Sequence, residues 1–130
     1  MERDETYRRK LRTIAEELAH LPEEPDRLSA LETRGVLHAI QVAIDAAMDL
    51  AAMRVRDLGA DVKDDYHNLD VMLEHGALDE AMADALRRLN GLRNAIVQKY
   101  NRFEERTVME RLTEIRSTLD RFAERLEDAI

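Results

Sequence analysis

The sequence predicts an all-α protein, an up-and-down bundle of about five amphipathic helices that works as a dimer. Only 4 Gly and 2 Pro interrupt its 130 residues, too few for the turns that an all-β protein needs. Ala, Leu, Glu, Arg and Met, which are good helix formers, are the main residue types. Apolar residues recur every three or four positions, which is the period of an amphipathic helix.

The length and composition of the chain predict one domain over residues 1–130. The absence of cysteine excludes disulfides and thiolate metal sites. The polar N-terminus lacks the apolar stretch of a signal peptide. The longest apolar stretch, residues 42–53, is interrupted by Asp45 and Asp49, so we expect no membrane span. These features predict a cytoplasmic protein.

Two helices are predicted in the first half of the chain. The first covers about residues 3–21 and is ended by Pro22 and Pro25. The second begins after Asp26, its expected N-cap, and continues to about residue 58, where a glycine follows.

Three more helices are predicted in the second half. A short helix covers about residues 64–74, a fourth follows its cap Asp79 to about residue 103, and a fifth covers residues 105–130. The fifth has a narrow apolar seam at four- and three-residue spacing, formed by Val108, Leu112, Ile115, Leu119, Phe122, Leu126 and either Ile130 or Ala129. The first helix has the same period, so we expect these two to pack as antiparallel neighbours.

Charge is spread unevenly along the chain. The net charge of −8 argues against broad nucleic-acid binding, and we expect no DNA partner. Residues 85–103, however, contain no acidic residue and five basic ones, Arg87, Arg88, Arg93, Lys99 and Arg102. This segment is either a local site for an anion or acidic partner, or a solvated helix face balanced by acidic neighbours.

A polar stripe follows the second helix, with His38, Gln41, Asp45 and Asp49 at spacings of three, four and four. Alanines between them would let another helix approach closely. The acidic end of this stripe is suited to pair with the basic fourth helix, either of the same chain or of a second copy across a two-fold interface.

Residue patterns for metal or cofactor binding are missing. His67 and His75 lie near several aspartates, but neither forms a ligand pair with the spacing of a zinc or di-iron site. The sequence also lacks a glycine-rich phosphate loop and a nucleophile elbow. We therefore expect neither a metal nor another cofactor.

The fourth helix carries the most distinctive segment. Arg93 and Tyr100, seven residues apart, lie almost on one line of the helix. Arg93 and Gln98 differ by about 140° and about 7.5 Å along the axis, so they flank a groove without touching. Two copies of this helix across a two-fold axis would enclose a polar, basic pocket.

Residues 91–100, Gly-Leu-Arg-Asn-Ala-Ile-Val-Gln-Lys-Tyr, resemble the Arg-x4-His-x-Tyr signature of HepT-like HEPN proteins, with Gln98 in place of the histidine. Residues 41–51 resemble the family's second helix, in which two acidic residues recur four apart. Residues 69–77 resemble the short helix and turn before the signature, and the last helix is similar to the family's closing helix. The resemblance therefore covers most of the chain.

The resemblance implies a homodimeric helical bundle that is the toxin of a toxin–antitoxin pair. Family members are metal-independent endoribonucleases with a composite site built from both subunits. Their partner is a minimal nucleotidyltransferase antitoxin, which in some members adenylylates the signature tyrosine. By this resemblance Arg93 would stabilise the phosphorane, Asn94 would position it, and Tyr100 would be the AMPylation site.

Gln98 is the departure from the family pattern. Histidine titrates near pH 6.5 and can move the RNA 2′-hydroxyl proton, whereas an amide can only form hydrogen bonds. We therefore expect weak or absent RNA cleavage, with His38 as the one histidine placed to substitute. The alternatives are a catalytically inactive module that binds and regulates a nucleotidyltransferase, and a structural helical dimer without a ligand.

Overall fold

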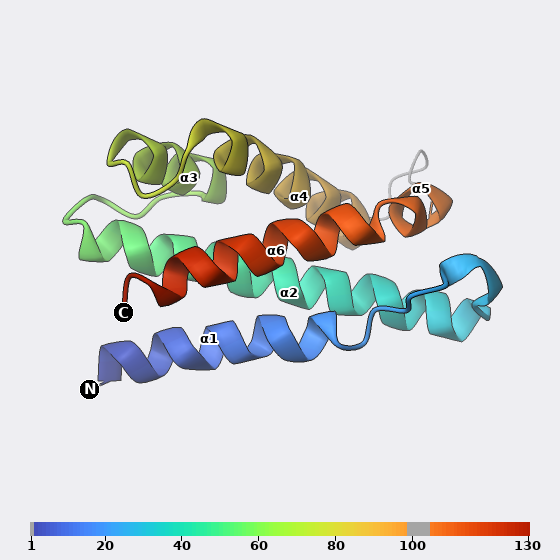
Figure 1. The fold of residues 1–130 in the computed structure, drawn as a ribbon. Helices are drawn as coiled ribbons and strands as arrows, with labels where there is room; N and C mark the ends of the chain where they lie inside the picture. Colours follow the sequence, from blue (N-terminus) through green and yellow to red (C-terminus); the bar gives the residue numbers. More distant parts are fainter. Residues whose placement is uncertain (1, 99–104) are drawn as a thin grey trace.

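The computed structural model describes residues 2–98 and 105–130 and arranges them as a helical bundle (Figure 1). The described residues contain no β-strand, so the predicted all-α class is confirmed. The elements are, in order, α1 (Glu2–Leu18), the 3-10 turn η1 (Pro25–Arg27), α2 (Ala30–Asp57), α3 (Asp65–Glu74), α4 (Glu80–Gln98), α5 (Glu105–Glu110) and α6 (Leu112–Glu127).

The long helices α1, α2, α4 and α6 run alternately in opposite directions, and both chain ends lie at the same end of the bundle (Figure 1). Contacts at its two ends fix the antiparallel pairing of α1 with α6. Arg3 donates to the backbone oxygen of Ala129 at 3.3 Å. At the other end, Arg116 donates to the backbone oxygen of Leu18 at 3.1 Å. The predicted pairing of the first and last helices is confirmed.

Helix α2 is the centre of the core, since it packs against α1, α3, α4 and α6. The predicted apolar stripes of the first and last helices are buried as far as Leu126, with Tyr7 at 1% and Phe122 at 0% exposure, whereas Ile130 is only partly buried. Side chains of α2 that have no exposed surface are Ile40, Ala43, Ile44, Ala47, Leu50, Ala51 and Val55.

Among the described helices, α2 is long and apolar enough to cross a membrane by length and composition alone. However, 67% of its most apolar 18-residue window is buried inside the bundle. The core helix of a soluble protein passes the same test, and the burial of α2 among four other helices accounts for its apolar character.

The start of α2 differs from the prediction. Asp26 lies in the turn η1, and the N-cap is Ser29, whose side chain accepts from the backbone N–H of Glu32 at 3.1 Å. The Glu32 carboxylate in turn accepts from the Ser29 N–H at 3.0 Å, which completes a capping box. These two reciprocal bonds satisfy two backbone N–H groups at the start of α2, so Ser29 is a better N-cap than Asp26. The first helix also ends earlier than predicted, at Leu18.

The predicted last helix is divided at Arg111 into α5 and α6. The Arg111 N–H bonds to Val108 three residues back at 3.0 Å, a tighter turn than the α-helix makes. This break directs α5 toward η1, against which it packs. The apolar seam continues across the break, with Val108 and Leu112 both buried.

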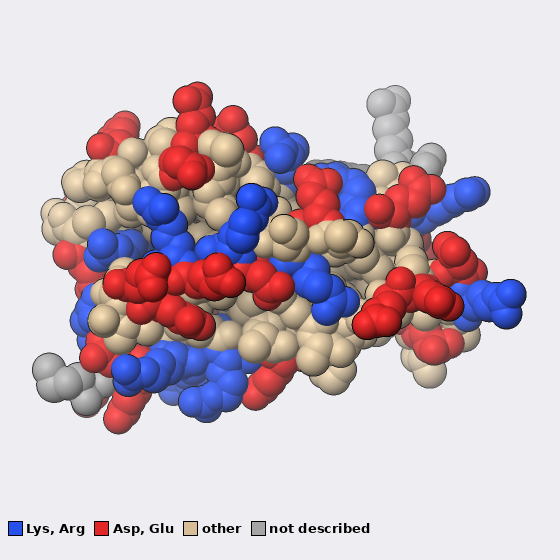
Figure 2. Space-filling model, viewed as in Figure 1, with Lys and Arg blue, Asp and Glu red and all other residues tan. Residues whose placement is uncertain are grey.

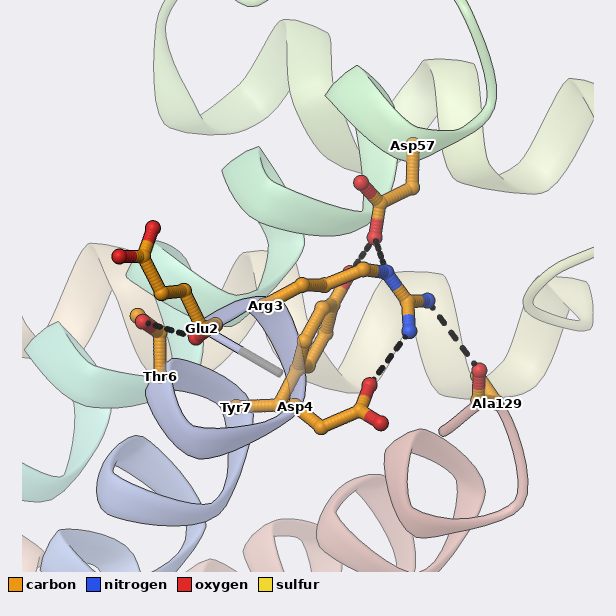
Figure 3. Close-up of polar contacts among 7 residues, drawn as sticks. All are labelled: Glu2, Arg3, Asp4, Thr6, Tyr7, Asp57 and Ala129. Atoms are coloured by element: carbon orange, nitrogen blue, oxygen red, sulfur yellow. Dashed lines mark hydrogen bonds and ion pairs between the residues drawn. The ribbon is translucent and has the colours of Figure 1, made fainter.

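A polar cluster ties the ends of α1, α2 and α6 together (Figure 3). The Tyr7 hydroxyl donates to the Asp57 carboxylate at 2.6 Å, and Arg3 Nε donates to the same oxygen at 2.8 Å. The Arg3 guanidinium also lies 4.9 Å from the centre of the Tyr7 ring. Burial, followed by the contact with Asp57, raises the pKa of Tyr7. Although burial raises the pKa of Asp57, its bonds from Tyr7 and Arg3 outweigh this and lower it.

Candidate functional site

Helix α4 positions the candidate residues of the site. It begins as predicted after Asp79, whose carboxylate accepts from the Met82 N–H at 2.7 Å. It continues to Gln98 without a break at the Asn90-Gly91 pair. Arg93 and Asn94 are half-buried, and Gln98 is exposed.

The structure brings Arg93 and Asp45 together. Arg93 Nε donates to the Asp45 carboxylate at 2.5 Å, and its Nη1 donates to the Asn94 side-chain oxygen at 3.2 Å. The side chains of Arg93 and Asp45 are 29% and 40% exposed. The acidic stripe of α2 thus pairs with the basic helix of its own chain, one of the two predicted arrangements.

Two further aspartates stand beside this pair. Asp49 forms an ion pair with Lys10 of α1 at 2.7 Å. Asp65, the first residue of α3, is partly buried near Arg93, Asp45 and Asp49. The pKa of the Asp65 carboxyl is raised, mainly by burial. The neighbouring Arg93 lowers this pKa, whereas Asp45 and Asp49 raise it. Asp65 therefore lies near two aspartates, each of which is paired with a cation.

Asp65 was not among the predicted site residues. The sequence showed it only as one of several aspartates near the helix 64–74, and it is the packing of α3 against α2 and α4 that brings it to Arg93. Its neighbour Asn90, on α4, is only 2% exposed and contacts Asp65. The side-chain oxygen of Asn90 has no hydrogen-bond partner among the described residues.

Gln98 and His38 lie at one end of the site. Because α2 and α4 run in opposite directions (Figure 1), residues before Asp45 lie on the same side as residues after Arg93. His38 is about 10.5 Å along α2 from Asp45, and Gln98 about 7.5 Å along α4 from Arg93. Both side chains are exposed, and within the described segments neither bonds to Arg93. Tyr100 lies outside the described residues.

The basic segment is largely balanced by carboxylates. Arg87 pairs with Asp70 at 2.5 Å and with Asp84 at 2.6 Å, and Arg88 approaches Glu114 at 3.9 Å. Lys99 and Arg102 lie outside the described residues. On the face shown in Figure 2, a row of acidic side chains follows α6, and basic side chains lie on both sides of it. Arg87 and Arg88 therefore fit the balanced interpretation of the charge run.

Within the parts of the chain that the structure describes, no three His, Asp or Glu side chains are arranged so that together they could hold a metal ion. His75, one of the two histidines considered for such a site, instead has Nδ1 at 3.0 Å from the backbone oxygen of Val71. The described site therefore offers a guanidinium, amides and carboxylates. These groups can bind a phosphate and exchange a proton.

Known proteins resemble this chain along its whole length. A family model described as "Ribonuclease HepT-like" matches residues 5–126. A protein of Archaeoglobus fulgidus, named as a candidate RNase, is 38% identical over 128 residues, which cover 98% of this chain and 96% of that protein.

Solved structures share the fold at low sequence identity. The tri-AMPylated HEPN toxin of Shewanella oneidensis, in complex with MNT antitoxin, matches with a TM-score of 0.86 at 15% identity, over 95% of this chain and 97% of that one. YutE, a cytosolic Bacillus subtilis protein of unknown function, matches with a TM-score of 0.83 at 17% identity, over 97% and 89% of the two chains.

Proposed function

Because the chain belongs to the HepT-like ribonuclease family, we propose that it is the toxin of a cytoplasmic toxin–antitoxin system, an RNA-cleaving homodimer. The observation that carries this proposal is the placement of Arg93. Its guanidinium is held by Asp45 and Asn94 yet remains partly open to solvent. A fixed, accessible guanidinium is suited to bind a phosphate and to stabilise the charge of its phosphorane.

The active site is a composite of two subunits. A single copy places one guanidinium beside Asp45 and near Asp65, which is a poor environment for a phosphate. Arg93 of a second copy across a two-fold axis would supply another guanidinium from the opposite side. Val97, one turn after Arg93, is 43% exposed, and this apolar surface beside the site is suited to a subunit interface.

The partner is a minimal nucleotidyltransferase antitoxin. The Shewanella oneidensis toxin is described as AMPylated and bound to such an antitoxin, and it shares the fold of this chain. By analogy, the antitoxin would transfer AMP to Tyr100, seven residues after Arg93. The reaction on RNA uses no metal and no cofactor.

The Gln98 substitution favours a second candidate function, an inactive module that binds and regulates the nucleotidyltransferase. An amide cannot accept the 2′-hydroxyl proton, and loss of a general base costs about 10²- to 10⁴-fold in rate. The two functions share the fold, the dimer and the partner. They differ in whether the Arg93 site turns over RNA.

The test is a paired cleavage assay of wild type, Gln98→His and Gln98→His/Arg93→Ala on one RNA, with and without EDTA. We expect weak cleavage by wild type, a gain of about 10²-fold or more in Gln98→His, and loss of that gain without Arg93. Arg88→Ala, which removes an exposed arginine of the same helix, is the matched control and should leave cleavage unchanged.

Light scattering should show a dimer at tens of micromolar protein. A stable monomer, or a Gln98→His dimer without any gain, would favour the regulatory module. Cleavage that is insensitive to Arg93→Ala would place the site elsewhere on the molecule.

A further inference from the structure

The three carboxylates beside Arg93 are not equivalent. Asp45 is neutralised by Arg93 at 2.5 Å and Asp49 by Lys10 at 2.7 Å. Asp65 makes no ion pair with any described residue, although it lies near the same arginine. It is therefore the carboxylate of this cluster whose charge is least engaged, and the one best able to accept a proton.

Asn90 gives an independent indication of proton transfer at this point. An amide beside a carboxyl group can stabilise both of its protonation states, since its N–H donates to the carboxylate and its oxygen accepts from the protonated acid. Asn90 contacts Asp65, is nine-tenths or more buried, and has an oxygen without a donor among the described residues. Once the amide turns this oxygen toward Asp65, a proton taken up by Asp65 would supply that donor.

We propose that Asp65 is the general base of the Arg93 site and takes the role that Gln98 cannot fill. This inference rests on the proposed RNA cleavage. The Asp65 carboxylate accepts the 2′-hydroxyl proton as the 2′-oxygen forms its bond to phosphorus. The P–O5′ bond breaks, and the departing 5′-oxygen takes a proton from water. The products are a 2′,3′-cyclic phosphate and a 5′-hydroxyl, and Asp65 returns its proton to solvent.

The groups around Asp65 support this assignment. Arg93 and Asn90 face it from α4, Asp45 and Asp49 from α2, and Lys10 of α1 reaches the cluster through Asp49. Burial and the two neighbouring aspartates raise the pKa of Asp65, which makes its carboxylate a stronger base. Arg93 on the same side can hold the phosphate that the 2′-oxygen attacks.

The test is a double-mutant cycle of Asp65→Asn and Gln98→His, with cleavage measured against pH. In the wild-type background, Asp65→Asn should lower kcat by about 10²-fold or more and remove the acid limb of the pH profile. In the Gln98→His background, the same change should cost less than about tenfold, because the histidine supplies a base. Asp65→Glu should retain part of the activity.

Two controls separate catalysis from folding and binding. Asp61→Asn makes the same charge change at an exposed position just before α3 and should not alter the rate. RNA with a 2′-deoxy sugar at the cleavage site, which cannot react, should bind Asp65→Asn at least as tightly as wild type, since a negative charge is removed.

Each other outcome overturns the inference. An equal loss in both backgrounds would make Asp65 a structural residue, and no loss would exclude it as the base. If wild type cleaves RNA and Asp65→Asn cleaves at the same rate, the inference fails and the proposed function stands. If wild type binds RNA without cleaving it while Gln98→His cleaves, the site has no second base and the inactive module is favoured. If neither protein binds or cleaves RNA, the proposed function itself fails.

Discussion

Replacing Asp45 with alanine should impair catalysis far more than folding. The Asp45 and Arg93 side chains are 40% and 29% exposed, so water screens their ion pair. Partly exposed pairs contribute about 0–1 kcal/mol to the free energy of unfolding. Without Asp45, however, Arg93 loses the partner of its Nε at 2.5 Å, and a guanidinium displaced by about 1 Å can cost about 10²-fold in rate.

Both kinetic constants, KM and kcat, should fall, for different reasons. Loss of one negative charge beside Arg93 should tighten RNA binding and lower KM, while misplacement of the guanidinium should lower kcat. The assay uses Gln98→His protein, in which the expected cleavage is readily measured, with and without Asp45→Ala. Urea unfolding of the same proteins measures the free energy of unfolding.

Asp70→Ala is the matched control for this prediction. It also removes the partner of an α4 arginine, Arg87, whose side chain is 30% exposed, at a similar distance of 2.5 Å. It should change stability as little as Asp45→Ala and leave kcat unchanged. A loss of more than about 3 kcal/mol in Asp45→Ala would mark the pair as a buried structural one, and an unchanged kcat would refute its role in orienting Arg93.

Further predictions concern stability and modification. Tyr7→Phe should lower the free energy of unfolding by about 1–2 kcal/mol in urea titrations, because Asp57 loses a 2.6 Å hydrogen bond; no change would refute the cluster's role. The lowered pKa of Asp57 adds stability that is present above the unfolded carboxyl pKa of about 3.9 and is lost as pH falls through the folded value. The raised pKa of Tyr7 adds stability that is present below the unfolded tyrosine pKa of about 10 and is lost as pH rises above it. Thermal melts against pH should therefore show an acid and an alkaline loss of stability, and Tyr7→Phe should abolish the alkaline loss. Incubation with the partner nucleotidyltransferase and ATP should add the mass of AMP to wild type and not to Tyr100→Phe, whereas equal labelling would place the modification elsewhere.

Much of the fold followed from local patterns in the sequence. The apolar period of α1 and α6 predicted their buried faces because a regular helix repeats its contacts at three and four residues. Asp79 caps α4, as its position indicated. The capping box of Ser29 and Glu32 was missed, because Asp26 was taken as the N-cap of the second helix. The break at Arg111 had no such signal, since the apolar seam continues through it.

The site was less predictable because it depends on contacts between helices. The sequence identified Arg93 and Asp45 as candidates, but it left open whether they meet within one chain, since that depends on the register of α2 against α4. Asp65 could not be identified as a site residue without knowing where α3 packs against α2 and α4. The sequence placed Gln98 on a different side of α4 from Arg93, and the structure leaves it exposed at the end of that helix.

Substrate binding should itself strengthen Asp65 as a base. A phosphate held by Arg93 brings negative charge close to a carboxylate that already lies near Asp45 and Asp49, and like charges raise a carboxyl pKa. The pH dependence of kcat reports the pKa of the enzyme–RNA complex, and that of kcat/KM reports the pKa of the free enzyme. The acid limb of kcat should therefore lie at higher pH than the acid limb of kcat/KM. Coincident limbs would mean that the phosphate does not bind beside Asp65.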